Sequence, residues 1–147
     1  APKEVQAVRF SELLDMSDVL VLCCPLTDET RGLIDARALQ SMRQGAILVN
    51  VARGPVVVED ALQNALESGR LGGAAIDVFD TQPLPQGHAF FKLPNVILTP
   101  HMAGITEESM LRMGEGVVKE ARLIAEGELP VQLVNPEAVA RYRERFA

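Results

Sequence analysis

Four short apolar runs recur along this chain, and segments with helical spacing lie between and after them. The runs cover residues 19–23, 46–50, 73–78 and 96–98. Consecutive apolar positions in runs of this length are typical of strands buried on both faces of a parallel sheet. A strand–helix–strand order at this spacing favours right-handed crossovers between parallel neighbours. The sequence therefore predicts an α/β fold with a doubly wound parallel sheet.

Helical spacing covers residues 35–42, 59–67 and 106–126. We expect Asp35 and Thr106 to cap the first and third of these helices, and a glycine follows the first two. One face of the third helix is apolar, with Met110, Met113, Val117, Ala121 and Ile124. The segment 79–94 has several prolines and no periodicity, and an irregular loop of this length is often functional.

Composition and charge exclude several classes of partner. The net charge of −6 repels a phosphate backbone, so we expect no nucleic acid. No apolar run approaches the length of a membrane span, and no leader-like segment opens the chain, so we predict a cytoplasmic protein with no membrane partner. Cys23 and Cys24 are neighbours that would point to opposite faces of a strand, so we predict reduced, buried thiols rather than a disulfide. No metal-ligand spacing flanks them, and we expect no metal site.

Polar side chains follow three of the four apolar runs. Arg53 comes after the second run, Asp77 lies within the end of the third, and His101 follows the fourth. Because the carboxyl ends of parallel strands meet at one edge of a sheet, we expect these three side chains to converge there. Each residue alone could be a surface charge or a cap, but their repetition at equivalent strand ends favours a site. We expect His88, within the proline-rich loop, to be solvated.

One motif of dinucleotide-binding sheets is missing from the chain. Such sheets usually open with a G-x-G-x-x-G turn, and the spacing of Gly69, Gly72 and Gly73 comes nearest without matching it. Two explanations are open. Either the protein does not bind a dinucleotide, or the first half of the fold precedes Ala1, where the chain begins without Met.

Four segments resemble the D-isomer-specific 2-hydroxyacid dehydrogenases, in the family's order and at its spacings. They are DVLVLCCPLT at 18–27, GAILVNVARG at 45–54, AIDVF at 75–79 and LTPHMAG at 98–104, and the resemblance extends over about residues 10–130. It implies that residues 1–130 form the C-terminal part of a Rossmann-like NAD-binding domain, followed by a tail at 131–147. The substrate domain and the Gly-rich turn would lie upstream.

The resemblance also implies ligands and partners. It implies NAD or NADP as the cofactor, a small 2-hydroxy or 2-oxo acid as the substrate, and a homodimeric parent. The isolated chain could then be inactive, because it lacks the phosphate-binding turn.

The same resemblance assigns roles to individual residues. Arg53 matches the arginine that grips the substrate carboxylate and polarises its carbonyl, which suits the guanidinium fork. His101 matches the acid/base that protonates the oxygen as hydride reaches the carbon. Gln82 stands in the loop at the position of its catalytic partner, and Asp77 matches the residue that holds the nicotinamide carboxamide. The positions that match cofactor contacts are Cys24, Pro25, Thr30, Val51, Ala52, Arg53, Asp77, His101, Ala103 and Gly104.

Gln82 departs from the family pattern, which usually has Glu at this position. Formate dehydrogenases of the same superfamily pair a Gln with the catalytic His, and formate oxidation has no hydroxyl proton to remove, so a formate-dehydrogenase-like activity is an alternative. A non-catalytic NAD-sensing scaffold on the same fold is a second alternative. The presence of both Arg53 and His101 argues for turnover.

The presence of Gln82 where the family usually has Glu predicts a pH effect in the parent enzyme. A carboxylate beside an imidazole favours the protonated ring, whereas Gln82 can orient His101 but supplies no charge. We expect carbonyl reduction to lose efficiency as pH rises, and a Gln82→Glu variant to hold its efficiency to higher pH. Rates of reduction across a pH series test this, and identical profiles for the two proteins would contradict it.

Overall fold

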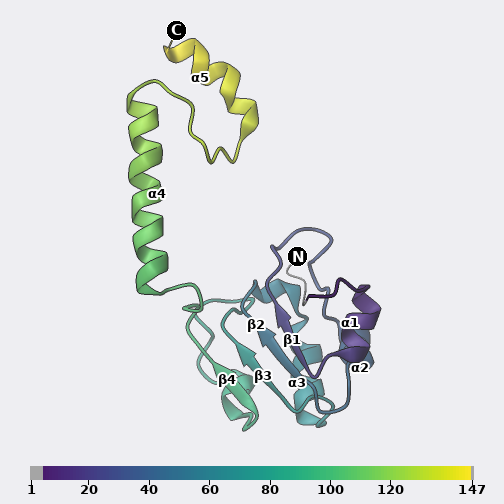
Figure 1. Ribbon diagram of the computed structural model, residues 1–147. Coiled ribbons are helices and arrows are strands. Elements are labelled where there is room, and N and C mark those ends of the chain that lie inside the picture. Colours follow the sequence, from purple (N-terminus) through teal and green to yellow (C-terminus); the bar gives the residue numbers. More distant parts are fainter. Residues whose placement is uncertain (1–4, 147) are drawn as a thin grey trace. The chain divides into compact units, whose positions relative to one another are not determined.

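A four-stranded parallel sheet forms the centre of the first part of the chain. The computed structural model describes residues 5–146, and the chain divides into two compact units, Ala1–Ala103 and Gly104–Ala147. In the first unit the strands lie in the order β1-β2-β3-β4, side by side in Figure 1. Their bounds are β1 Val19–Leu22, β2 Ile47–Asn50, β3 Gly73–Ile76 and β4 Val96–Leu98. All neighbours are parallel, which confirms the predicted Rossmann-like α/β sheet.

Helices connect the strands where the sequence predicts them. Helix α2 (Ala36–Ser41) follows β1, and α3 (Glu59–Glu67) follows β2. Asp35 caps α2 by accepting a hydrogen bond from the backbone N–H of Ala38 at 2.8 Å. Gly69 follows α3 with a φ of 70°, a conformation that side chains with a Cβ rarely adopt. Helix α1 (Phe10–Met16) escaped the sequence analysis, because it is short and its N-cap residue is Arg9.

Only one face of this sheet is covered within the first unit, as far as its described residues go. Leu20, Leu48 and Ile76 point to the covered face and are buried, whereas Val19 and Ile97 on the other face are 51% and 68% exposed. The expectation of burial on both faces is therefore wrong for this unit. Successive right-handed crossovers that add each strand in the same direction place their helices on the same side of the sheet.

The loop after β3 is irregular, as predicted, but its end is firmly packed. Residues 89–92 form a short 3-10 helix, η2 (Ala89–Lys92), in which the side chain of Phe90 is 1% exposed. A second such turn, η1 (Gly54–Val56), follows β2. The core that these elements share is mostly aliphatic, and its largest fully buried members include Ile34, Leu48 and Leu62.

The second unit contains α4 (Glu107–Ala125), the 3-10 turn η3 (Pro136–Ala138) and α5 (Val139–Phe146). Thr106 caps α4 as predicted, since its hydroxyl oxygen accepts from the N–H of Ser109 at 3.2 Å. None of the described α4 residues is buried, so its predicted apolar face is exposed. The helix α5 was not predicted, and the domain boundary at residue 130 stays a prediction. No helix in the described part of the chain is long and apolar enough to cross a membrane.

The uneven burial of the sheet predicts a contrast between two substitutions in the 147-residue chain. Leu48→Ala, at a site with no exposure, should lower the free energy of unfolding by about 2–5 kcal/mol. Ile97→Ala, on the uncovered face, should change it by less than about 0.5 kcal/mol. Urea unfolding of both variants measures the difference, and equal losses would show that the second face is packed in solution.

Candidate functional site

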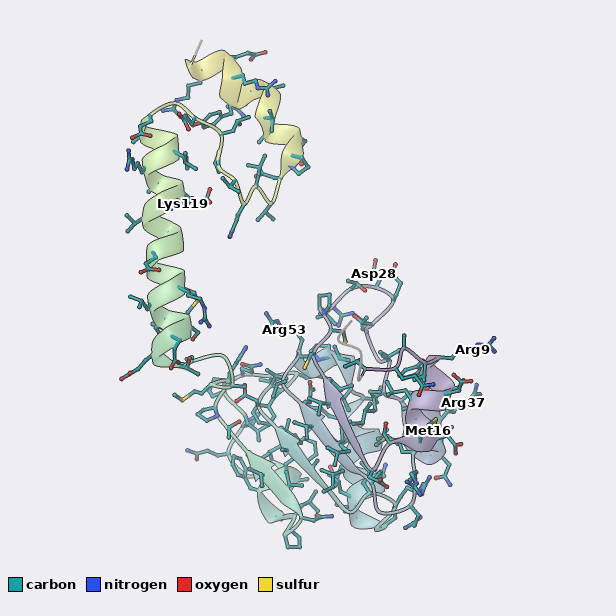
Figure 2. All side chains as sticks on the ribbon, viewed as in Figure 1. Arg9, Met16, Asp28, Arg37, Arg53 and Lys119 are labelled. Atoms are coloured by element: carbon teal, nitrogen blue, oxygen red, sulfur yellow. The ribbon has the colours of Figure 1, made fainter. Side chains whose placement is uncertain are left out.

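The turn after β2 presents Arg53 at the carboxyl edge of the sheet (Figure 2). Asn50, the last residue of the strand, is 2% exposed and braces this turn. Its side-chain oxygen accepts from the N–H of Ala52 at 3.1 Å, and its amide nitrogen donates to the carbonyl of Arg53 at 3.2 Å. The Arg53 guanidinium donates to the Ala52 carbonyl at 2.6 Å and is otherwise free to face a ligand, as far as the described contacts show.

Gly54 allows this turn to lie directly against the loop that follows β3. A Cβ at this position would lie 2.1 Å from the carbonyl carbon of Phe79 and 2.2 Å from its oxygen. No side chain can occupy that space without moving the backbone. The residue type at position 54 therefore fixes how closely the two connections approach.

Asp77 follows β3 directly and joins it to the residues after β4. Asp77 is 4% exposed, and its side chain accepts three hydrogen bonds. The Thr99 hydroxyl donates to Oδ1 at 2.5 Å, the N–H of Met102 donates to Oδ1 at 2.8 Å, and the N–H of Ala103 donates to Oδ2 at 3.0 Å. Burial alone would raise the pKa of Asp77, but these donors outweigh it, and with the nearby His101 they hold the pKa below its ordinary value.

His101 lies between the residues that Asp77 holds, and its backbone is strained. Its φ of 59° is in the left-handed region, which costs about 1–2 kcal/mol for a residue with a Cβ. The hydrogen bonds that Thr99, Met102 and Ala103 donate to Asp77 maintain this conformation on both sides. Such conformations concentrate at functional sites, where the surrounding structure determines them.

The imidazole of His101 is paired with the side chain of Gln82, as the sequence predicts. Nδ1 of His101 lies 2.9 Å from Oε1 of Gln82, and Nε2 of Gln82 donates to the carbonyl of Phe79 at 3.2 Å. The second contact determines the orientation of the amide, so the Gln82 oxygen faces the ring. His101 therefore carries a proton on Nδ1, and its Nε2 is the atom available for proton transfer.

The pair lies in the wall of a cavity of about 490 Å³. Gln82, Thr99 and His101 supply its polar groups. The remaining walls are apolar or prolyl: Phe79, Pro83, Leu84, Phe91, Leu98 and Pro100. An apolar pocket with a few convergent polar groups is typical of a small-molecule site.

The predicted cofactor residues after β1 form an ordered turn. The Thr30 hydroxyl donates to the carbonyl of Pro25 at 2.7 Å and accepts from the N–H of Thr27 at 2.8 Å. Cys24 is partly buried against the core, but Cys23 is exposed, so the prediction of two buried thiols is wrong for Cys23. Cys23 continues the alternation of Val19 and Val21, which point to the uncovered face.

The other predicted cofactor residues follow β2 and β4. Ala52 is buried and Val51 partly buried in the Arg53 turn, and the backbone of Ala103 is bonded to Asp77. Gly104 begins the second unit, where its carbonyl accepts from the Ser109 hydroxyl at 2.5 Å. The cofactor role of each of these residues stays a prediction. Within the described residues, no group of three or more His, Cys, Asp or Glu side chains is placed to hold a metal ion.

Sequence reasoning missed several residues that build this edge. Asn50 shares the alternation of buried Leu48, so its polar side chain at an inward position was a usable signal. Thr99 and Glu59 had no such signal, because their partners are 22 and 21 residues away in sequence. His88 is not solvated as expected: its side chain is 23% exposed, and Nε2 lies 3.7 Å from Oε2 of Glu59.

A parallel sheet with polar side chains gathered at its carboxyl edge defines the Rossmann-like class of α/β domains. Residues 1–103 match the family described as the D-isomer specific 2-hydroxyacid dehydrogenase, NAD binding domain. The match extends over more than half of the chain, and the chain belongs to this family.

Known relatives support the assignment and are longer than this chain. A glyoxylate reductase of Thermofilum pendens is 44% identical over 127 residues, which are 86% of this chain and 38% of that protein. A D-isomer specific 2-hydroxyacid dehydrogenase from Xanthobacter autotrophicus, solved with NADPH and MES, has a TM-score of 0.76 and 41% identity over 87% of this chain and 52% of its own.

A third relative has a different cofactor. The NAD-complexed enzyme from Lactobacillus delbrueckii has a TM-score of 0.77 and 31% identity over 86% of this chain and 43% of its own. The chain thus spans about two-fifths of the length of the curated relatives it matches.

The Asp77 contacts predict a pH-dependent loss of stability in an Asp77→Asn variant. Because the folded state lowers the pKa of Asp77, its stabilisation is present above the ordinary carboxyl pKa and is lost as pH falls below about 4. We expect the variant to be less stable by about 1–3 kcal/mol at neutral pH, with the difference shrinking in acid. Urea unfolding at several pH values measures this.

Asp35→Asn is the matched control, because Asn caps a helix as well as Asp does. Faster hydrogen exchange at Met102 and Ala103 in the Asp77 variant alone would locate the effect. A stability difference that is constant with pH would contradict the assigned role of the carboxylate.

Proposed function

We propose that the parent protein of this chain transfers a hydride between NAD or NADP and a small 2-hydroxy or 2-oxo acid. The observation that carries the proposal is the Gln82–His101 pair, held at the carboxyl edge of a family NAD-binding domain by the contacts of Asp77. An imidazole with one nitrogen anchored and the other available is suited to acid/base catalysis. The resemblance also supports a homodimeric, cytoplasmic parent.

Glyoxylate is the first substrate to test. Several relatives with 42–44% identity are named glyoxylate reductases. A small 2-oxo acid presents a carboxylate and a carbonyl on adjacent carbons, which an arginine and an acid can engage together. In the proposal, the Arg53 guanidinium binds the carboxylate through its fork and polarises the carbonyl.

His101 moves the proton in this proposal, and Gln82 keeps the ring in place. In reduction, protonated His101 donates from Nε2 to the oxygen that gains charge. In oxidation, the neutral ring accepts the hydroxyl proton at the same atom. Gln82 Oε1 accepts from the Nδ1–H in both states, so the orientation persists through the cycle.

The residues of the chain fit the nicotinamide end of the cofactor, which supplies the hydride when bound. The Asp77 carboxylate keeps acceptor capacity on Oδ2 beyond its one backbone donor, so it can receive a carboxamide N–H. The ordered turn from Pro25 to Thr30 and the backbone of Val51 and Ala52 lie after neighbouring strands, where such a ligand crosses the sheet. Asp77 would then orient the ring that faces His101.

The Gln82–His101 contact also supports a second candidate, formate oxidation. An uncharged partner suffices when no hydroxyl proton is removed, and the pair has the geometry for it. A non-catalytic NAD-binding scaffold is the third. Nicotinamide absorbance separates the three candidates. A change with glyoxylate, pyruvate or hydroxypyruvate and NADH or NADPH supports 2-oxo acid reduction, and a change with formate and NAD supports formate oxidation. No change in either assay supports a scaffold.

Substitution of the two central residues in the parent enzyme tests the assigned roles. His101→Asn should lower kcat by about 10²- to 10⁴-fold with a smaller effect on cofactor binding. Arg53→Lys should raise the KM for the acid, since an ammonium cannot contact a carboxylate in two places. Arg43→Lys is the control, because Arg43 forms an exposed ion pair with Asp18. Unchanged reduction in both site variants would refute the proposal.

A further inference from the structure

The loop of residues 79–94 must hold Gln82 within hydrogen-bond distance of His101, although it contains no strand and only the short helix η2. Its two ends are fastened by packing. Phe79 lies against Gly54, and Phe90 is buried in the core. Between these ends, most of the side chains from Asp80 to His88 are exposed or partly exposed. Packing at the two ends therefore does not fix the position of Gln82, which depends on contacts of the segment from Asp80 to His88.

Glu59, the first residue of α3, reaches this span with both of its carboxylate oxygens. Oε1 accepts from the N–H of Asp80 at 2.8 Å, and Oε2 lies 3.7 Å from Nε2 of His88. The side chains of Glu59 and His88 are 21% and 23% exposed, so the pair is partly shielded from solvent. The two contact points, Asp80 and His88, lie on either side of Gln82 in sequence, so the carboxylate links two parts of the loop. We call these two contacts of Glu59 the clasp.

His88 is oriented for this contact by its own neighbours. Its Nδ1 accepts from the N–H of Phe90 at 3.3 Å, and its ring meets that of Phe90 edge-on, with 4.7 Å between centroids. The neutral ring therefore carries its proton on Nε2 and directs it to Glu59. His101 has the opposite arrangement, with its proton on Nδ1 toward Gln82. The two histidines of the chain are thus held in opposite tautomers.

We propose that Glu59 is a positioning residue for the site. By binding the N–H of Asp80 and the ring of His88, it holds the loop in the conformation in which Gln82 accepts from His101. A carboxylate acceptor makes a stronger hydrogen bond than a neutral one, and its position on a helix end fixes where that acceptor lies. The catalytic importance of this clasp rests on the proposed function, but the clasp itself does not.

Nitrogen NMR of the uniformly labelled 147-residue chain tests the clasp without any turnover. Only two histidines occur in the chain, so their ring signals are readily assigned, and the spectra are recorded at about pH 8. In the unsubstituted 147-residue chain we expect the Nδ1–H form for His101 and the Nε2–H form for His88. In Glu59→Ala, the His101 signals should move toward a mixture of tautomers, and the Asp80 amide should exchange about tenfold faster.

Two further variants sharpen the result. Asp60→Ala removes the same charge from the same helical turn at an exposed position and should leave both histidines unchanged. Glu59→Gln keeps an acceptor for the Asp80 N–H and should largely restore the tautomer of His101. If Glu59→Ala does not fold, Glu59→Asp gives the same test, because it keeps the charge but is one methylene too short to reach both partners.

The proposal would be overturned if His101 kept the Nδ1–H form in a folded Glu59→Ala or Glu59→Asp chain. It would also be overturned if Asp60→Ala changed the His101 tautomer as much as Glu59→Ala does. Thermal unfolding of each variant establishes that the chain is folded. Because no readout depends on substrate or cofactor, failure of the clasp and failure of the proposed activity are separate outcomes.

Discussion

The carboxylate of Asp77 accepts three hydrogen bonds from the residues that follow β4, and the geometry of the site depends on them. They connect the carboxyl ends of two neighbouring strands and hold His101 in a left-handed backbone conformation that it would not adopt alone. Desolvation opposes burial of a carboxylate, so the position is stable only because protein donors replace water. The same donors keep the pKa of Asp77 low and the group charged beside the imidazole.

A second series of contacts connects the Arg53 turn to the same imidazole. Gly54 admits the backbone of Phe79, the Phe79 carbonyl accepts from the Gln82 amide, and the Gln82 oxygen faces His101. Each contact sets the orientation of the next. The predicted carboxylate-binding and proton-transfer groups are therefore positioned by backbone packing between two connections. A change in the turn after β2 would therefore alter the orientation of the His101 imidazole without contacting the ring.

The sequence predicted the strands and most of the helices, because periodicity, caps and strand ends are local signals. The Gln82–His101 pair was expected from the family resemblance alone. The expectation of burial on both sheet faces was wrong for the first unit, since coverage depends on the direction in which successive crossovers add strands. Asp77 was recognised as a site residue, but its partner Thr99 was not, because their contact is tertiary. His88 and Cys23 were misjudged for the same reason: exposure is decided by what packs against them.

The structure gives the amide at position 82 a role beyond the absence of charge. The Phe79 carbonyl accepts a hydrogen bond from the Gln82 nitrogen at 3.2 Å. A carboxylate in the same place has no N–H to donate, so in Gln82→Glu the Phe79 carbonyl would lose this hydrogen bond while the charge faces His101. Because Gly54 presses the turn against Phe79, that carbonyl has little room to move away. The contact with Phe79 thus fixes which way the amide faces, and the tautomer of His101 follows from that orientation.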